Sequence, residues 1–451
     1  MKIFTDLKTS YLDNKFVKDG FFLYFGRSIN LLVGLVSTLI YGVIFMKKEI
    51  AVISLFEMVV NLFLSFGFTW STLALTRFGK EEIQKHNSIN HTSSIRIGII
   101  SPLLLVSTFL IIFFMKNILA YIGTNDFTII IYLLLNLILL VIHEHIIYIY
   151  TSLEKHVQNV FYYLGQSIGK AGILIIFYYH MSDNTSAELY LKLNVFLLLL
   201  LLLLRMLSFE YSYIFPISFG KKNDYVNQLK YVLPQIYGFA GLYIINWVDV
   251  YFIRKYWDFD DLGAYQFLYS IFMKFSSFAI ILNTLFFPKI MDWKLRNESY
   301  LIKYLKKAPL ILLLASGICF GVFLLVYQPL FAVFFKEKYR NAYTAFNILI
   351  FSLPFYFISF LYIPVLNSFD RVKYIQFVCI FSASCNVLID YIFIKKYGLI
   401  AAALGTFIAY FSTYILLTLA VEKMFNIKYK LVNAVSSLMF LGVIGYIIIV
   451  L

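Results

Sequence analysis

Thirteen long apolar runs constrain this 451-residue chain more than any other feature of its sequence. A helix needs roughly 20 mainly apolar residues to cross a bilayer, and lipid forces each segment to satisfy its own backbone hydrogen bonds. Only 14% of the residues are charged, against about 25% in soluble domains. The sequence therefore predicts an all-α integral membrane protein with about 12–13 transmembrane helices. The runs are 20–46, 50–74, 95–115, 126–150, 157–180, 187–211, 231–253, 262–288, 308–328, 343–366, 372–394, 398–421 and 432–451.

The distribution of Lys and Arg predicts the orientation of these helices. With the N-terminus in the cytoplasm, the cytoplasmic links hold more than twice as many Lys and Arg residues as the outer loops, as the positive-inside rule requires. Arg96 is counted here with the cytoplasmic residues. The net charge of +14 is explained by this topology and by attraction to anionic headgroups, so nucleic acid is not needed as a partner.

The lengths of the links and of the first apolar run argue against a catalytic domain and against a cleaved signal peptide. The links are too short for a soluble catalytic domain, so we expect no enzyme. The polar segment 1–20 precedes a run that is too long for a signal peptide, and we expect it to lead into an uncleaved first helix. The cysteines lie inside apolar runs without the spacing of metal ligands, and we expect no metal site and no bound cofactor.

The order of the runs predicts two similar halves. Helices one to six (1–212) and seven to twelve (231–424) form two six-helix lobes, joined by a basic cytoplasmic linker at 213–230. Residues 49–78 align with 261–290, and both stretches begin with an acid and end with a base. Duplicated bundles of this kind are a transporter architecture, with the substrate path between the halves. The run at 431–451 is an additional helix without a counterpart.

Four basic residues fall inside the apolar runs. Lys170 and Lys274 lie near the middle of their runs, Arg27 lies about a third of the way into the first, and Arg205 lies near the inner end of the sixth, where it could reach the headgroups. A charge in the membrane centre costs on the order of 2.5–3.5 kcal/mol, so it needs a partner or a wet cavity. Cationic side chains in a cavity favour an anionic substrate such as a pyrophosphate.

The alternative is that each cation pairs with an intramembrane acid. The acids available are Glu57, Glu144, Glu210 and Asp249, but none lies at the depth of the two mid-membrane lysines. Glu57, Glu144 and Asp249 are also candidates for coupling transport to H⁺ or Na⁺.

His143, Glu144 and His145 form the only local cluster of titratable residues well inside the apolar runs. Consecutive residues on a helix point about 100° apart, so the three cannot form one metal-binding face. Because His titrates near neutrality, His143 and Glu144 are candidates for a protonation relay. The other interpretations are a polar lining of the cytoplasmic mouth and hydrogen bonds between helices. Asp390, next to Lys395 and Lys396, is expected at the membrane interface.

Three short motifs resemble those of a known transporter family. The stretch 67–78 has a Gly-containing turn that leads to a basic residue at the end of the second helix. The eighth helix begins with Gly263-x-Tyr265 and closes with Pro288, and 386–403 is similar to the corner between helices eleven and twelve. These features resemble the O-antigen (Wzx-type) flippases of the multidrug/oligosaccharidyl-lipid/polysaccharide (MOP) exporter superfamily, over roughly residues 15–421.

The resemblance implies a fold, a substrate and a location. It implies two six-helix bundles in a MATE-like V-shaped arrangement that alternates between inward and outward openings. The implied substrate is an undecaprenyl-pyrophosphate-linked repeat unit of O-antigen, lipopolysaccharide or capsule, moved from the cytoplasmic to the periplasmic leaflet of the bacterial inner membrane. Polysaccharide polymerases and glycosyltransferases are implied partners. Arg27 and Lys274 match the positions of basic residues that contact the pyrophosphate in related flippases.

Three other functions remain open. A cation-coupled multidrug exporter of the same fold typically has an acid in its first helix, where this chain has Arg27. A membrane-embedded polysaccharide polymerase or ligase usually has a large outer loop, and none is predicted here. A flippase for a peptidoglycan precursor shares the fold but usually has fourteen helices.

Overall fold

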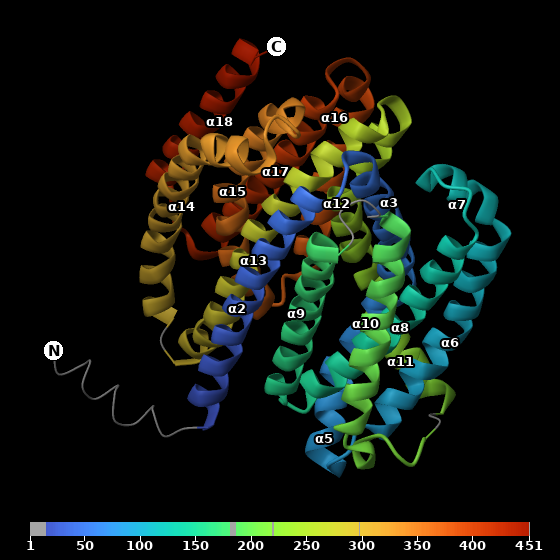
Figure 1. The fold of residues 1–451 in the computed structure, drawn as a ribbon. Helices are drawn as coiled ribbons and strands as arrows, with labels where there is room; N and C mark the ends of the chain where they lie inside the picture. The colour runs from blue at the N-terminus through green and yellow to red at the C-terminus, as the bar shows by residue number, and fades with distance from the viewer. Residues whose placement is uncertain (1–14, 181–185, 219–220, 297, 451) are drawn as a thin grey trace. The chain divides into compact units, whose positions relative to one another are not determined.

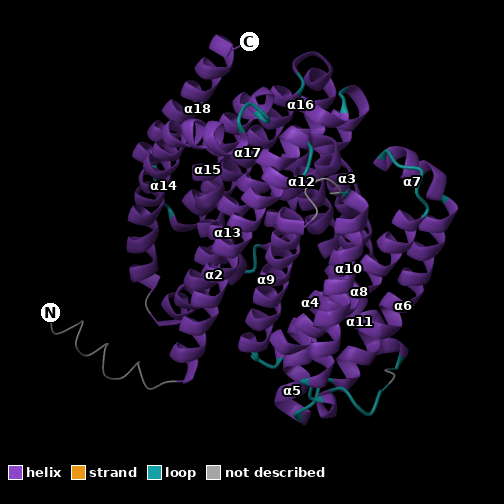
Figure 2. Cartoon of the chain, viewed as in Figure 1, coloured by secondary structure: helices purple, strands orange, loops and turns teal. Residues whose placement is uncertain are grey.

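The computed structural model describes residues 15–180, 186–218, 221–296 and 298–450. The described chain is helical throughout and contains no strand (Figures 1 and 2). Twelve helices in this part are long and apolar enough to cross a membrane, and each matches one predicted run. The remaining run, 262–288, lies within α13 (Phe259–Arg296). The predicted all-α membrane fold is therefore confirmed; the first fourteen residues of the polar segment 1–20 lie outside the described residues.

The chain divides into two compact units, one of which contains residues up to Ile44 together with Leu55–Ile236. The helices of this unit 1 are α2 (Lys15–Ile44), most of α3 (Lys47–Phe63), α4 (Thr72–Ala74), α5 (Lys80–His86), α6 (Asn90–Phe113), α7 (Met115–Ile122), α8 (Thr128–Ser152), α9 (His156–His180), α10 (Ala187–Leu207) and α11 (Lys222–Val232).

Unit 2 contains Phe45–Ser54 and Tyr237–Leu451. Its helices are α12 (Ile236–Tyr256), α13, α14 (Glu298–Phe335), α15 (Tyr343–Ser368), α16 (Val372–Tyr397), α17 (Leu399–Phe425) and α18 (Lys430–Val450), together with the first residues of α3. The most buried span is Arg340–Ser368, which includes α15. It packs against α13, α14 and α17 and is the centre of this unit.

Residues with clear local preferences set several helix ends. Ser186 caps α10, because its hydroxyl accepts a hydrogen bond from the backbone amide of Leu189 at 3.2 Å. Asn87, Gly123 and Asn426 follow α5, α7 and α17 in the left-handed conformation, with φ of 52°, 87° and 52°. Gly and Asn adopt this conformation at lower cost than other residues, so they end these helices where the chain must turn.

The second predicted run is helical but irregular. Between α3 and α5 the chain makes two π-helical turns, η1 (Leu64–Phe68) and η3 (Leu75–Gly79), with the 3₁₀ turn η2 (Thr69–Ser71) and α4 between them. Single-turn π-bulges in helices often mark functional sites. The side chains of Ser71 and Thr72 bond back to the carbonyls of Phe68 and Thr69, each at 2.6 Å, which supports the local distortion.

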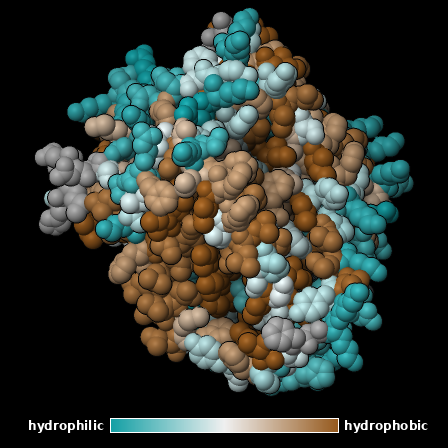
Figure 3. All heavy atoms as spheres, turned by 90° about the vertical axis from the view of Figure 1, so that its right-hand side faces the viewer, coloured by the Kyte–Doolittle hydropathy of each residue, from teal (hydrophilic) through white to brown (hydrophobic). Residues whose placement is uncertain are grey.

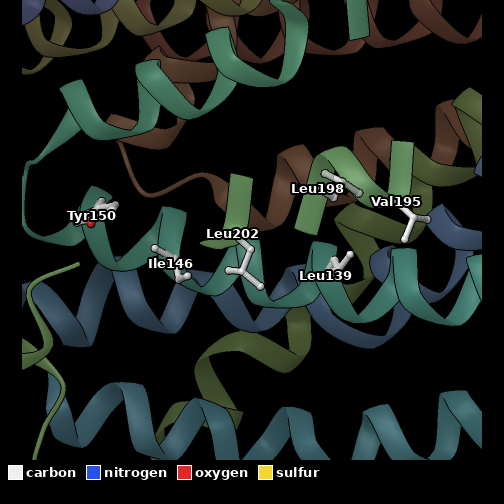
Figure 4. Close-up of a cluster of buried hydrophobic side chains, with 6 residues drawn as sticks. All are labelled: Leu139, Ile146, Tyr150, Val195, Leu198 and Leu202. Atoms are coloured by element: carbon white, nitrogen blue, oxygen red, sulfur yellow. The ribbon is translucent and has the colours of Figure 1, made fainter. Parts of the chain in front are cut away.

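Apolar side chains cover both the interior and much of the surface of the units. Figure 3 shows apolar residues across the middle of one face and polar residues gathered toward its edges. On α6, for example, Leu105, Phe109 and Phe113 are exposed, as lipid-facing residues would be. Inside unit 1, α8 and α10 pack through a buried apolar cluster (Figure 4). Its members are Leu139, Ile146, Tyr150, Val195, Leu198 and Leu202.

The segment 45–54 is held in unit 2 by polar contacts at the start of α13 and in the turn before α15. The ammonium group of Lys338 donates to the carbonyl of Phe45. Lys47 donates to Asn341 Oδ1 at 3.4 Å, and Asn341 donates to Asp261 Oδ1 at 2.6 Å. The beginning of α3 therefore belongs to a different unit from the rest of that helix.

Lys338, in the loop between α14 and α15, gives unit 2 a pH-dependent stability. Burial lowers the pKa of its ammonium group from 10.5 to about 8, and Glu49 only partly opposes this shift. Because the pKa is lower in the folded than in the unfolded chain, the folded state gains stability as the pH rises from about 8 to 10.5. We expect a gain of about 1 kcal/mol, since solvent screens the partly exposed side chain.

Thermal unfolding in detergent across this pH range measures the effect. Lys338→Met removes the titrating group, so we expect its pH dependence to be flatter than that of the wild type. Lys48→Met, at an exposed lysine of the same segment, serves as the control and should keep the wild-type slope. Equal slopes in Lys338→Met and the wild type would contradict the prediction.

Candidate functional site

Two buried carboxyl groups meet inside unit 2. Asp249 of α12 and Asp390 of α16 are 1% and 0% exposed, and they lie within hydrogen-bonding reach of each other. No described hydrogen bond joins the two carboxyl groups, so two carboxylates here would repel each other. A proton on one of them, or a bound cation, would remove this repulsion.

Neighbouring side chains direct further polar atoms at this pair. The hydroxyl groups of Tyr265 and Thr406 both donate to Asp249 Oδ2, the latter at 2.7 Å. Asn386 Nδ2 donates to Asp249 Oδ1 at 3.2 Å. In the described part of the chain, Asn386 Oδ1 and both carboxyl oxygens of Asp390 have no hydrogen-bond partner. Three buried oxygens are therefore available to a ligand.

The sequence builds this site from one helical turn of α16 and a close approach of α17. Asn386 and Asp390 are four residues apart, so they lie on one face of α16. A Cβ atom at Gly405 would lie 2.4 Å from Asn386 Oδ1 and 2.7 Å from Asp390 Oδ1. Only glycine lets α17 come this close, and Thr406, the next residue, then reaches Asp249.

The donor set suits a small hard cation or a proton. Oxygen ligands favour hard cations, whereas transition metals prefer sites that include His or Cys. Among the described residues there is no group of three or more His, Cys, Asp and Glu side chains that could hold a metal ion. Two carboxyl groups with neutral oxygens match H⁺ or a monovalent cation such as Na⁺.

The prediction for Asp390 is wrong. It was expected at the membrane interface because two lysines follow it, but it is fully buried. The helix α16 continues to Tyr397, so Lys395 and Lys396 lie on later turns while Asp390 faces α12 and α17.

The four predicted cations are divided between the units. Arg27 on α2, Lys170 on α9 and Arg205 on α10 belong to unit 1, and Lys274 on α13 belongs to unit 2. The helix α2 packs along α9, where Ser167 donates to Asn30 Oδ1 at 2.5 Å, and the charge of Arg27 acts on Tyr163 of α9.

Arg205 does not reach toward the headgroups as predicted. It is 6% exposed, and its guanidinium lies 4.9 Å from the ring centroids of both Tyr150 and Tyr162. Its Nη2 donates to Asn159 Oδ1 at 2.7 Å. Stacking and the amide oxygen partly compensate the buried charge, because Nε and Nη1 have no hydrogen-bond partner among the described residues.

The remaining candidate acids and histidines also lie in unit 1. Glu57 is exposed on α3, whereas His143 is 1% exposed and its Nε2 bonds the carbonyl of Leu198 at 3.0 Å. Glu144 accepts a hydrogen bond from Thr69 at 2.9 Å. Arg96, counted from the sequence with the cytoplasmic residues, is fully buried in α6 rather than exposed in a link between helices. The neighbouring serines of α6, Ser93 and Ser94, are the sequence feature from which a buried polar group around Arg96 could have been predicted.

Three solved structures share the arrangement of helices seen here. The lipid II flippase MurJ in an inward closed conformation superposes with a TM-score of 0.65 at 17% identity, over 89% of this chain and 87% of that chain. An inward-facing multidrug resistance MATE family transporter of the MOP superfamily gives 0.62 at 12%, over 88% and 94%. The Vibrio cholerae MATE transporter VcmN in the bent form gives 0.55 at 12%, over 90% and 97%.

The sequence alone finds no such relatives. No protein-family model matches it, and neither does any curated protein. The likeness is therefore one of structure, and it extends over most of this chain and of each neighbour. The chain has the fold of the lipid II flippase MurJ and of the MATE transporters of the MOP superfamily.

Proposed function

We propose that the protein is a cation-coupled flippase for an undecaprenyl-pyrophosphate-linked oligosaccharide, such as a repeat unit of O-antigen or capsule. It moves this lipid from the cytoplasmic to the periplasmic leaflet of a bacterial inner membrane by alternating access. Glycosyltransferases supply the substrate and a polysaccharide polymerase uses the product. The fold supports the transporter class, since one neighbour is named a lipid II flippase and others are MATE transporters.

One observation carries the choice of an anionic substrate. Lys170 is half-buried in the membrane-spanning helix α9, and it makes no hydrogen bond or ion pair with any described residue. An uncompensated cation at this depth costs on the order of 2.5–3.5 kcal/mol, which a phosphate group offsets. We assign Arg27 and Lys274 to the same role, as basic residues on spanning helices of each unit.

Flipping by the purified protein in liposomes tests this function. The substrate is a fluorescent undecaprenyl-pyrophosphate oligosaccharide, and a membrane-impermeant reductant bleaches only the outer leaflet. We expect Lys170→Ala to slow flipping by about tenfold or more, since a bond between a charged donor and phosphate contributes ~1.5–3 kcal/mol. Lys170→Arg keeps the charge and should retain more activity than Lys170→Ala.

Lys116→Ala is the matched control, because Lys116 is an exposed lysine of unit 1 on α7. It should flip at the wild-type rate. A wild-type rate in Lys170→Ala as well would show that Lys170 does not bind the substrate. If the wild-type protein did not flip the labelled lipid, the proposed lipid-linked substrate would be wrong.

A multidrug exporter is the second candidate, supported by the structural likeness to MATE transporters and by the Asp249–Asp390 pair. An exporter of this kind would carry organic cations outward at the expense of an ion gradient. Efflux of a fluorescent organic cation from the same liposomes, driven by a pH or Na⁺ gradient, would favour it over the flippase. We expect no such efflux.

A further inference from the structure

A second group of buried polar side chains lies in unit 1, whereas the carboxyl pair belongs to unit 2. It joins α6, α8 and the irregular segment 64–79, and its centre is Arg96, which is fully buried. Arginine stays charged at all relevant pH values, so this interior must accommodate a permanent cation.

The hydrogen bonds of Arg96 determine the protonation state of His145. Arg96 Nε donates to Ser71 Oγ at 3.0 Å, and Nη1 lies 2.7 Å from His145 Nδ1. A guanidinium can only donate, so Nδ1 must be the acceptor and the ring proton lies on Nε2. That nitrogen is 3.0 Å from Ser93 Oγ, to which it donates. His145 is therefore neutral and positions Arg96, and it cannot take up a proton without releasing the arginine.

Glu144 and Arg96 each have one buried atom without a partner. Glu144 Oε1 accepts from Thr69 Oγ1 at 2.9 Å, but Oε2 has no hydrogen-bond partner in the described part of the chain, and neither does Arg96 Nη2. The two charges act on each other, yet no described atoms of the pair form an ion pair. A buried carboxylate without a partner is costly, and either a proton on Oε2 or an ion pair with Arg96 Nη2 lowers this cost.

The titratable groups next to Glu144 are tyrosines and His143. The tyrosines are neutral near physiological pH. His143, the residue before it, donates through Nε2 to the carbonyl of Leu198, so its Nδ1, which has no partner among the described residues, is a second proton acceptor that the Glu144→Gln variant leaves in place. The permanent charges that act on this region besides Arg96 are those of Arg205 and Arg27, through the tyrosines of α9. The tyrosines are Tyr148 of α8 and Tyr162 and Tyr163 of α9.

We propose that Glu144 is a proton-binding site of unit 1 and that its two protonation states select different partners. With a proton on Oε2, Glu144 is neutral and stays bonded to Thr69. When the proton leaves to solvent, the carboxylate forms an ion pair with Arg96 Nη2 and releases Thr69. Thr69 begins η2, between the two π-helical turns. The protonation of Glu144 therefore determines whether the segment 64–79 is hydrogen-bonded to α8 through Thr69. This site shares no residue with the carboxyl pair in unit 2 or with the basic residues assigned to the substrate.

Trp70 offers a direct reporter of this change. It is 3% exposed, its indole donates to the carbonyl of Phe66 at 2.9 Å, and it lies between Thr69 and Ser71. The other three tryptophans, Trp247, Trp257 and Trp293, belong to unit 2 and can be replaced by Phe. The fluorescence of Trp70 in this background then follows unit 1 alone.

The experiment is a titration of Trp70 fluorescence from about pH 4 to about pH 9, the range in which buried carboxyl groups titrate. We expect one step in the parent protein and none in Glu144→Gln, which imitates the protonated state. Glu144→Asp keeps a carboxyl group and should show a step at a different pH, and Arg96→Gln should move the step to higher pH because it removes the opposing charge.

Glu188→Gln is the matched control, since Glu188 is an exposed carboxylate of unit 1 on α10, and it should keep the parent step. A step that persists unchanged in Glu144→Gln would overturn the proposal, and so would a parent protein without any step. Folding of each variant is checked by size-exclusion chromatography. If Glu144→Gln does not fold, an unchanged midpoint in Glu144→Asp would overturn the proposal equally.

Discussion

On the proposal that transport is cation-coupled, Asp249→Asn is expected to abolish the stabilisation that the coupling cation gives to the folded protein. The substitution keeps the size of the side chain but removes one of the two carboxyl groups of the site, next to the partnerless oxygens of Asp390 and Asn386. A cation at about 100 times its dissociation constant stabilises the folded state by ~2.7 kcal/mol, and we expect nearly all of this to be lost. Cation-driven transport should fall at least ~10-fold, as in other sites that lose a ligand interaction.

Thermal unfolding in NaCl and in choline chloride at equal ionic strength, repeated over a pH series, measures this loss and separates Na⁺ from H⁺. Asp390→Asn should behave like Asp249→Asn. Asp260→Asn, at an exposed acid of the first turn of α13, should respond to cations like the wild type. Full cation-dependent stabilisation in Asp249→Asn would contradict the assignment, and so would a wild type that responds to neither ion.

Gly263→Ala is expected to have the largest effect on stability of any single methyl group added to unit 2. A Cβ atom at Gly263 would lie 1.8 Å from the carbonyl oxygen of Lys47 and 2.5 Å from its carbonyl carbon. These are backbone atoms at the start of α3, which cannot move aside as a flexible side chain can. We expect a loss of about 3 kcal/mol or more, at the upper end of the cost of overpacking.

Gly321→Ala is the matched control on α14, where the added Cβ would meet no atom within 4 Å. Its effect should be within about 1 kcal/mol and in the stabilising direction, because Ala favours helices more than Gly does. The comparison is made by thermal unfolding of both variants in the same detergent. Similar unfolding temperatures for the two variants would show that the helices α3 and α13 do not meet as closely as described.

The Gly263-x-Tyr265 motif shows how sequence and structure complement each other. The sequence pointed to the motif only through a resemblance to the start of a helix. In the structure, Gly263 permits the close crossing with Lys47, and the hydroxyl of Tyr265 donates to Asp249. The two residues thus connect the segment 45–54 with the carboxyl pair, although neither role follows from their spacing.

The polar sites were predicted less completely than the helices. Asp249 and Glu144 stood out because acids inside apolar runs are rare. Asp390 and Arg96 lie near the ends of their runs, where charged residues are common, and the same sequence position is compatible with an interface or with burial. Which of the two holds depends on whether another helix covers that turn. The helix α17 covers the turn that carries Asp390, and Gly405 lets it approach that closely. The irregular segment 64–79, which includes Ser71, covers the turn that carries Arg96.

The sequence by itself determined that the chain is a bundle of long membrane-spanning helices. Length and hydropathy suffice for this because, in lipid, each helix satisfies its own backbone and needs no neighbour to exist. Only the tertiary structure decided which charged groups meet, that residues 45–54 join unit 2, and that both buried sites have unpaired oxygens. Such contacts join residues far apart in the sequence, from 25 positions between Ser71 and Arg96 to 137 between Asp249 and Asn386, and no local pattern encodes them.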